Sequence, residues 1–163
     1  MFREMRRGRQ QLTEDEARRI LEEGTSGVLA LSGDDGYNYA VPISYALDGN
    51  KIYFHSARSG HKLDAIGRND RVSFCVIDQD KIVPEEFTTY FRSAIAFGRI
   101  RIVEDDVDPE KRRGLELLAE KYSPTVDVDA RDKELMKMKA CVVLILEIEH
   151  LTGKAAKELM AKK

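Results

Sequence analysis

The chain has 163 residues, the length of one domain or of two very small ones. Apolar residues make up 42% of it and charged residues 34%, a globular balance that excludes a disordered chain. The 27 Lys and Arg residues against 29 Asp and Glu residues leave a net charge of -2, so the overall charge gives no argument for binding nucleic acid or an anionic membrane.

The apolar and cysteine-containing segments indicate a cytoplasmic protein without a metal site. The longest apolar run, Cys141–Leu146, is too short to cross a bilayer, and the Arg-rich residues 1–11 lack the apolar segment of a secretory signal. Cys75 and Cys141 lie within apolar stretches, where we expect buried thiols rather than a disulfide. Two cysteines and three scattered histidines do not match a zinc site.

The first expected element is a helix that follows the basic N-terminal arm. Thr13 and Glu16 match a capping box, apolar residues then recur at helical spacing, and Gly24 ends the helix. The sequence contains neither a repeat nor a Gly/Ser-rich linker. We therefore treat residues 1–163 as a single domain whose residues 1–11 form the arm.

Strands dominate the rest of the chain. Six strands are expected, at residues 28–31, 37–47, 51–56, 71–77, 89–103 and 141–149. Further helices are expected at residues 60–67, 110–121, 131–137 and 155–161. Tight turns join the first three strands, which argues against parallel winding. The pattern predicts a mainly β fold with α additions, built as an antiparallel barrel.

The turn after the third strand is the strongest candidate for a binding site. Helices favour acidic residues in their first turn, but this one begins with His61 and Lys62 and follows Arg58. A bound phosphate would explain the pattern, because free backbone N–H groups and cations together attract an anion. Ser56 and Ser59 would add hydroxyl donors. The alternative is a solvated basic turn in which Ser59 caps the helix.

The strand over residues 37–47 is the second candidate. Its residues alternate between a large apolar face and a face of small residues, and Pro42 interrupts the middle. Proline donates no ladder hydrogen bond, so the strand is expected at a sheet edge. A flat ring could then approach the small face and meet free backbone groups of Val41, Ile43 and Tyr45. The alternative is an ordinary edge strand that Pro42 protects against aggregation.

Two further segments carry polar residues at the ends of predicted strands. Arg92 and Ser93 open the long fifth strand, where they face either a ligand or the solvent rim. Thr152 and Lys154 lie where the last strand meets the last helix, and their ordinary roles would be a helix cap and a solvated cation. Neither segment identifies a ligand. The sequence also lacks a nucleophile elbow, a P-loop and a dinucleotide fingerprint.

The order of these motifs resembles the pyridoxamine 5'-phosphate oxidase-like, FMN-binding split-barrel proteins, and among them most closely the 5-nitroimidazole-resistance branch. Nearly the whole chain takes part, and the most specific part is the run from His55 to Lys62. The motifs that carry the resemblance are Met5–Arg7, Val28–Leu31, Tyr39–Tyr45, Ile52–Ala57, Gly60–Lys62, Tyr90–Gly98 and Leu151–Ala155.

This resemblance implies a six-stranded split β-barrel and a homodimer with two FMN sites at the subunit interface. Matching positions imply that Ser56, His61 and Lys62 hold the phosphate, with Arg58 beside them, and that His55 lies at the active centre near the flavin. The expected contacts to the flavin ring and edge are Val41, Pro42, Ile43, Ser44, Tyr45 and Ser93. Thr152, Gly153 and Lys154 would reach a flavin site of their own or of the partner subunit.

The sequence departs from the true pyridoxamine 5'-phosphate oxidases in two places. Their second strand carries an Arg and a Lys that bind the flavin phosphate, where this chain has only Val41 and Ala46. It also lacks a C-terminal Arg/His clamp for a substrate phosphate. Vitamin B6 oxidation is therefore not expected, whereas FMN binding still is, because the nitroimidazole-resistance branch shares these departures.

The preferred function is an FMN-dependent oxidoreductase that reduces a small electrophile such as a nitroaromatic. Reduced nicotinamide or another donor would supply electrons, and His55 would supply a proton or orient the substrate. Three alternatives stay open. They are a flavin-binding redox sensor or carrier without turnover, a split barrel that binds deazaflavin or heme (with His150 or His61 as axial ligand), and an interaction module that uses the basic arm for RNA or an acidic partner.

Overall fold

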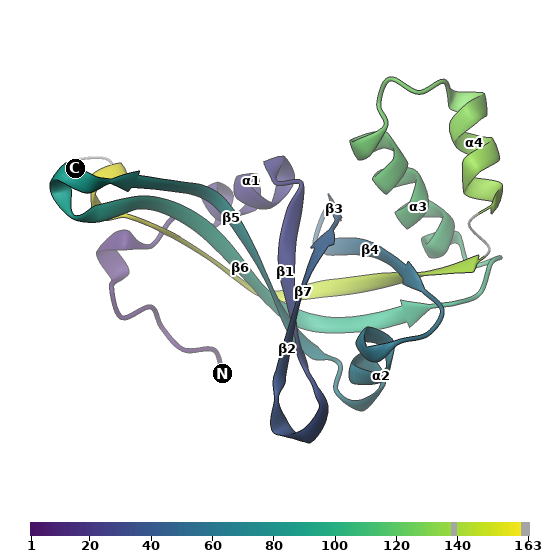
Figure 1. Ribbon diagram of the computed structural model, residues 1–163, viewed down its shortest axis with the longest axis horizontal. Coiled ribbons are helices and arrows are strands. Elements are labelled where there is room, and N and C mark those ends of the chain that lie inside the picture. The colour runs from purple at the N-terminus through teal and green to yellow at the C-terminus, as the bar shows by residue number, and fades with distance from the viewer. Residues whose placement is uncertain (138–139, 161–163) are drawn as a thin grey trace.

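The computed structural model describes residues 1–137 and 140–160 as one antiparallel sheet with helices around it (Figure 1). The strands are β1 (Ser26–Ser32), β2 (Asn38–Ser44), β3 (Ala46–Asp48), β4 (Lys51–Ala57), β5 (Arg71–Val83), β6 (Thr88–Val103) and β7 (Cys141–Ala155). The helices are α1 (Glu14–Glu23), α2 (His61–Arg68), α3 (Pro109–Tyr122) and α4 (Val128–Lys137). The mainly β prediction is confirmed.

The sheet has seven strands in the order β2-β1-β5-β6-β7-β4-β3, not the six expected. The difference arises at Tyr45, which divides the expected strand 37–47 into β2 and β3. The Tyr45 side chain is fully buried and its hydroxyl donates to the carbonyl of Leu21 at 2.6 Å. Its backbone N–H donates to the hydroxyl of Tyr122 at 3.0 Å instead of to a neighbouring strand. One residue thus ends the pairing with β1 and starts the pairing with β4.

The two edges of the sheet therefore follow each other directly in the sequence. Strand β2 pairs only with β1 and strand β3 only with β4 among the described residues, and Tyr45 alone separates them. The sheet must curl for its opposite edges to meet at one residue, although it stays open between them. The edge position expected for Pro42 is confirmed, since it lies on β2.

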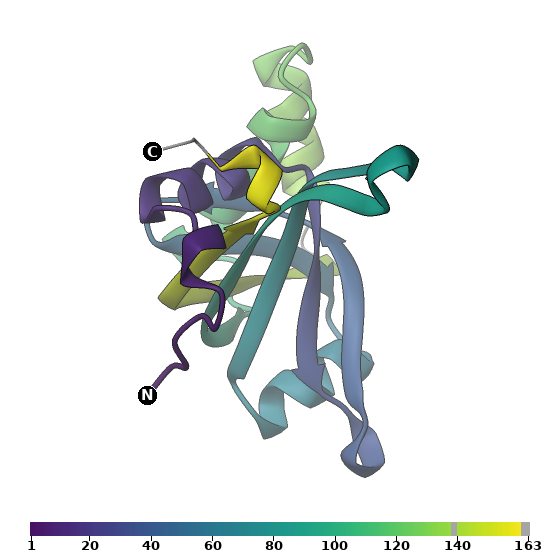
Figure 2. The same ribbon diagram turned by 90° about the vertical axis from the view of Figure 1, so that its left-hand side faces the viewer.

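Strand β7 is six residues longer than expected, and this removes the C-terminal helix. Strands β5 and β6 form a long hairpin that stands out from the rest of the molecule (Figure 2). Strand β7 pairs with β6 as far as Ala155, and the N–H of Ala156 then donates to the carbonyl of Phe91 at 2.8 Å. The helix expected at 155–161 is therefore wrong within the described residues, where only a short turn at Lys157–Leu159 follows; residue 161 lies outside them.

Local signals placed the first two helices correctly. The Thr13 hydroxyl accepts from the N–H of Glu16, and the Glu16 carboxylate accepts from the N–H of Thr13, which completes the predicted capping box. Leu63 and Ile66 bury the apolar side of α2, as expected. These helices cover the main core, in which the rings of Phe54 and Tyr45 both pack edge-on against Phe74.

A second, smaller core lies under α3, at the end of the molecule opposite the long hairpin (Figure 1). Leu115 of α3 packs with Tyr53, Val143 and Ile145 of the sheet. Gly114 allows this approach, because an added Cβ would come within 2.8 Å of the Tyr53 ring. Helices α3 and α4 form a hairpin over this region, so the sheet supports a helical cover here.

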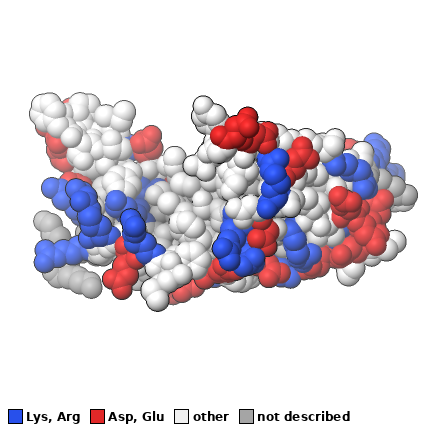
Figure 3. Space-filling view, turned by 90° about the horizontal axis from the view of Figure 1, so that it is seen from below, with Lys and Arg blue, Asp and Glu red and all other residues white. Residues whose placement is uncertain are grey.

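The two cysteines, expected to be buried thiols, are only partly buried. Neither Cys75 nor Cys141 forms a disulfide among the described residues, and burial raises the pKa of both thiols. No group of three metal-ligating side chains occurs in the described part of the chain. Within the same residues, no helix is both long and apolar enough to cross a membrane. On the face shown in Figure 3, Lys and Arg lie beside Asp and Glu, with uncharged surface between them.

Candidate functional site

The turn between β4 and α2 leaves the start of the helix without a side-chain cap. The cap position is Gly60, not Ser59, and its φ of 129° is a conformation that favours glycine. No side chain bonds to the first N–H groups of α2 from this position. The N–H groups of Leu63 and Asp64 donate to the Gly60 carbonyl, so among the described residues the donors that still need water or a ligand are those of His61 and Lys62.

Lys62 is the cation that faces this turn. Its Nζ lies 3.4 Å from the Ser56 hydroxyl, and it pairs with no carboxylate in residues 1–137 and 140–160. Lys62 is half-buried, and this desolvation lowers the pKa of its amine. A partly desolvated positive charge without a counter-ion would gain from a bound anion. The structure thus brings together Ser56 and Lys62 as predicted.

Arg58 and His61 have partners of their own beside this turn. The Arg58 guanidinium bonds to Asp106 at 3.0 Å and to the carbonyl of Glu104 at 3.4 Å. His61 Nε2 lies 3.6 Å from Asp34 Oδ2, and its ring stacks on Tyr39 with the centroids 4.1 Å apart. Both side chains are exposed, so contact with a phosphate stays a prediction for them. Ser56 and Lys62 are the better supported pair.

His55 joins this group from the last part of β4. Burial, followed by the nearby charge of Lys62, lowers the pKa of its imidazole below the ordinary value of 6.5. The lowered pKa favours the neutral ring, which donates one hydrogen bond and accepts another. His55 and Ser44 line a common cavity of about 550 Å³ with helices α3 and α4.

The sequence did not point to α3 and α4 as walls of this cavity. Their inward residues include Leu115, Leu118, Tyr122 and Arg131. The only signal was the helical spacing of apolar residues in the segment 110–121, which predicts a buried side without naming its partner.

The backbone of β2 meets the expectation only in part. The side chains of Pro42 and Ser44 are exposed and those of Val41 and Ile43 half-buried, as the alternation predicts. The expectation that Tyr45 has free backbone groups is wrong. Its N–H donates to the Tyr122 hydroxyl, which also lies 2.9 Å from the Tyr45 carbonyl oxygen.

The remaining predicted contacts lie far along β7. Ser56 is paired with Val142, whereas Ser93 is paired with Lys154, twelve residues further along that strand. At about 3.3 Å per residue, this spacing corresponds to about 40 Å. Gly153 packs closely against Leu12 and Ala17, where an added Cβ would come within 3.0 Å of either side chain. One chain therefore does not bring these residues to the Ser56–Lys62 pair.

Strand register nevertheless places Ser93, Thr152 and Lys154 on the face of the sheet that Pro42 of β2 occupies, whereas Gly153 lies on the opposite face. Pro42, Val28, Cys75, Ile95 and Thr152 form one row across five neighbouring strands. Thr152 lies within β7, so it is not the helix cap of the alternative reading. We call this surface the outer face; Val28 is 37% exposed on it and Ile77, paired with Ser93, is 65% exposed.

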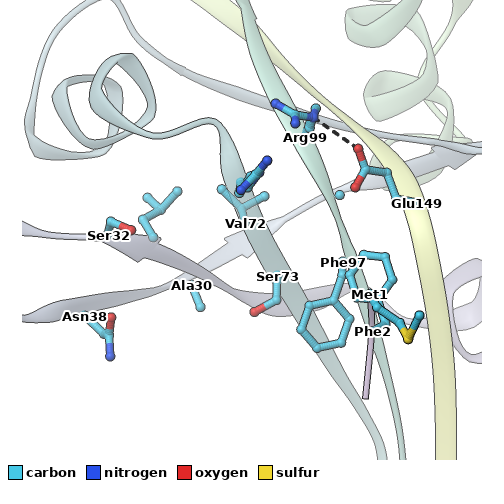
Figure 4. Close-up of a pocket in the computed structure, with 13 residues that line it drawn as sticks. Met1, Phe2, Ala30, Ser32, Asn38, Val72, Ser73, Phe97, Arg99 and Glu149 are labelled. Carbon is cyan, nitrogen blue, oxygen red and sulfur yellow. Dashed lines mark hydrogen bonds and ion pairs between the residues drawn. The ribbon is translucent and has the colours of Figure 1, made fainter. Parts of the chain in front are cut away.

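A separate cavity of about 690 Å³ lies under the N-terminal arm (Figure 4). Phe2 stacks on His150 with the centroids 4.6 Å apart and lies beside Phe97. Arg99 points to its wall but bonds to Asp70 and Glu149. No residue predicted to bind the flavin lines this cavity in the described part of the chain.

Comparison with known proteins identifies the fold and the family. A candidate 5-nitroimidazole antibiotic resistance protein from Bacteroides thetaiotaomicron is 21% identical with a TM-score of 0.72, covering 89% of this chain and 86% of that one. A conserved hypothetical protein from Mycobacterium tuberculosis is 19% identical with a TM-score of 0.79, covering 98% and 96%. An FAD-binding protein from Mesorhizobium loti is 22% identical with a TM-score of 0.65, covering 90% and 96%.

The search of curated proteins gave no match. The sequence pattern described as pyridoxamine 5'-phosphate oxidase, by contrast, matches residues 13–155. These residues include every strand and every predicted site residue. The resemblance deduced from the motifs is confirmed, and the chain belongs to the pyridoxamine 5'-phosphate oxidase family.

Proposed function

We propose that this protein binds FMN and uses it to reduce a small electrophilic substrate of the nitroaromatic class. The observation that supports this most directly is the uncapped start of α2, with Lys62 and Ser56 beside it and His55 next to them. The names of two similar structures, an FAD-binding protein and a candidate nitroimidazole resistance protein, agree with this proposal.

The residues of the turn fit a phosphate group. The backbone donors at the start of α2, the Ser56 hydroxyl and the Lys62 amine are all donors, and a phosphate supplies only acceptors at neutral pH. Gly60 presents no side chain that would fill the turn, since nothing lies within 4 Å of a Cβ built on it. The site therefore has room, donors and one unpaired positive charge.

The protein's own part in the reaction would be small. When bound, the flavin would supply the redox chemistry and pass electrons from a donor such as reduced nicotinamide to the acceptor. His55 lines the cavity in which a substrate would lie, and its lowered pKa favours the neutral ring, which would orient the substrate through one donated and one accepted hydrogen bond rather than supply a proton. The apolar walls of α3 and α4 would exclude water from that cavity.

A second copy of the chain would complete the flavin site. Ser93 and Lys154 lie on the outer face, about 40 Å along β7 from the partner of Ser56, so both groups reach one flavin only across a subunit interface. The exposed Val28 and Ile77 on the same face would be covered by that interface. A homodimer is therefore part of the proposal.

Comparing FMN with riboflavin tests the phosphate site, because riboflavin has the same ring and no phosphate. By calorimetry on flavin-free protein, we expect FMN to bind at least about tenfold more tightly than riboflavin. Lys62→Ala should weaken FMN binding about tenfold or more and leave riboflavin binding nearly unchanged. The control is Lys81→Ala, since Lys81 is exposed on the distant hairpin.

Equal affinity for FMN and riboflavin would overturn the phosphate site, and equal affinity for FMN and FAD would overturn the choice of FMN. A heme absorption band without flavin would overturn both. Turnover is tested by reducing the bound flavin with NADH or NADPH and adding a nitroaromatic acceptor. Reoxidation that does not depend on the acceptor would leave a sensor or carrier. An unchanged rate in His55→Ala would remove this histidine from its role.

A further inference from the structure

The cavity of about 550 Å³ under the α3–α4 hairpin has the size and lining of a small-molecule site. Its walls are mainly apolar side chains that come from both helices and from the loop between them. They are Leu115, Leu118, Ala119, Val126, Ala130 and Leu135. His55 and Ser44 close it on the side of the sheet. A ligand here would have an apolar body.

Among residues 1–137 and 140–160, Arg131 is the one Lys or Arg that lines this cavity. Its Nε is buried and has no hydrogen-bond partner among the described residues. Burial without a partner is costly for a guanidinium N–H, which is always a donor and is never deprotonated in proteins. The arrangement therefore leaves a fixed positive charge with unused donor capacity beside apolar walls.

Arg131 forms no ion pair among the described residues, although Glu134 lines the same cavity and Glu116, Glu120 and Asp132 line a neighbouring hollow with it. Glu134, which also lines the cavity, bonds to Lys137 at 3.1 Å, and both side chains are largely exposed. The Asp127 carboxylate accepts from the backbone N–H groups of Asp129 and Ala130. An internal salt bridge therefore does not account for Arg131, whereas an external carboxylate would satisfy it with two parallel hydrogen bonds.

We propose that the cavity between α3, α4 and β4 binds a small aromatic carboxylate, with Arg131 holding the carboxylate and the apolar walls holding the ring. Its role as the substrate site rests on the proposed function, because His55 is shared by the cavity and by the flavin site. Binding itself does not require the flavin. The charge selects an anion over a neutral or cationic ligand of the same shape.

The test compares 1-naphthoate with 1-naphthamide, which has nearly the same shape without the charge. Calorimetry on the full chain should show naphthoate binding at least about tenfold more tightly than the amide. Arg131→Gln should reduce naphthoate affinity to that of the amide, and Arg131→Lys should restore part of the difference. Lys133→Gln is the matched control, because Lys133 is exposed on the same helix and does not line the cavity.

Equal binding of acid and amide, or no loss in Arg131→Gln, would overturn the proposal. Circular dichroism of each variant shows whether α4 has kept its fold, and Arg131→Lys keeps the test decisive if the Gln variant unfolds. Flavin retention is measured on the same samples. If the protein retains flavin but does not bind naphthoate, the carboxylate site alone is refuted. If it binds naphthoate but no flavin, the proposed function alone is refuted.

Discussion

The charge state of His55 depends on its immediate surroundings. Its imidazole loses water to the neighbouring side chains, and Lys62 adds a repelling positive charge, so both causes lower its pKa. In the unfolded chain neither cause acts. As pH falls below about 6.5, His55 binds a proton in the unfolded chain but not yet in the folded protein. The free energy of unfolding therefore falls until the pH passes the lowered pKa of the folded protein.

An NMR titration of the His55 ring would measure this directly. The expected pKa lies below 6.5 in the native protein. Lys62→Ala should raise it only part of the way back, because burial is the larger cause. Between about pH 7 and pH 5, the native protein should also lose more stability to urea than His55→Gln. A pKa at or above 6.5 would contradict the neutral role assigned to this ring.

The end of α3 holds together the seam between β2 and β3. The Tyr122 hydroxyl bonds to the Tyr45 N–H at 3.0 Å and also to Thr25, while Lys121 lies over the Tyr45 ring with its Nζ 4.1 Å from the centroid. Helix α3 thus supplies the hydrogen bond that a neighbouring strand would otherwise supply. The helical cover and the break in the sheet depend on each other.

Removing the Tyr122 hydroxyl tests this link. Tyr122→Phe keeps the ring but leaves the Tyr45 N–H without its partner, and the expected loss of unfolding free energy is about 1 kcal/mol. Urea denaturation measures it, with Tyr37→Phe as control, because Tyr37 is 78% exposed. If both variants unfold at the same urea concentration, the seam does not depend on this hydrogen bond.

Features of the structure that depend on neighbouring residues could be predicted from the sequence, whereas features that depend on distant residues could not. The cap of α1 depends on residues three positions apart, and the family motif at His55–Lys62 is contiguous, so both could be predicted. The break at Tyr45 depends on Tyr122, 77 residues away. The cavity requires the packing of two helices against β4, which no short motif records. The prediction of a C-terminal helix was wrong because the pairing of β7 with β6 overrides the local helix preference at Ala155.

At the scale of the whole molecule, the proposed homodimer would make the outer face part of the flavin site. Hydrodynamic mass by analytical ultracentrifugation should be twice the 18.5 kDa of one chain. Ile77→Lys places a charge on that face and should yield monomers with weaker FMN binding. Val107→Lys is the control, since Val107 is 85% exposed in the loop before α3. A monomeric native protein that retains FMN would contradict the shared site.

The central position of β7 has a consequence for synthesis. This strand pairs with β6 on one side and with β4 on the other, although it follows both by many residues. A nascent chain on the ribosome therefore has two separate half-sheets, β2-β1-β5-β6 and β4-β3, whose inner edges are unpaired until β7 emerges. Unpaired edges are prone to aggregation. Translation of residues 141–155 is thus the step that allows the two half-sheets to become one.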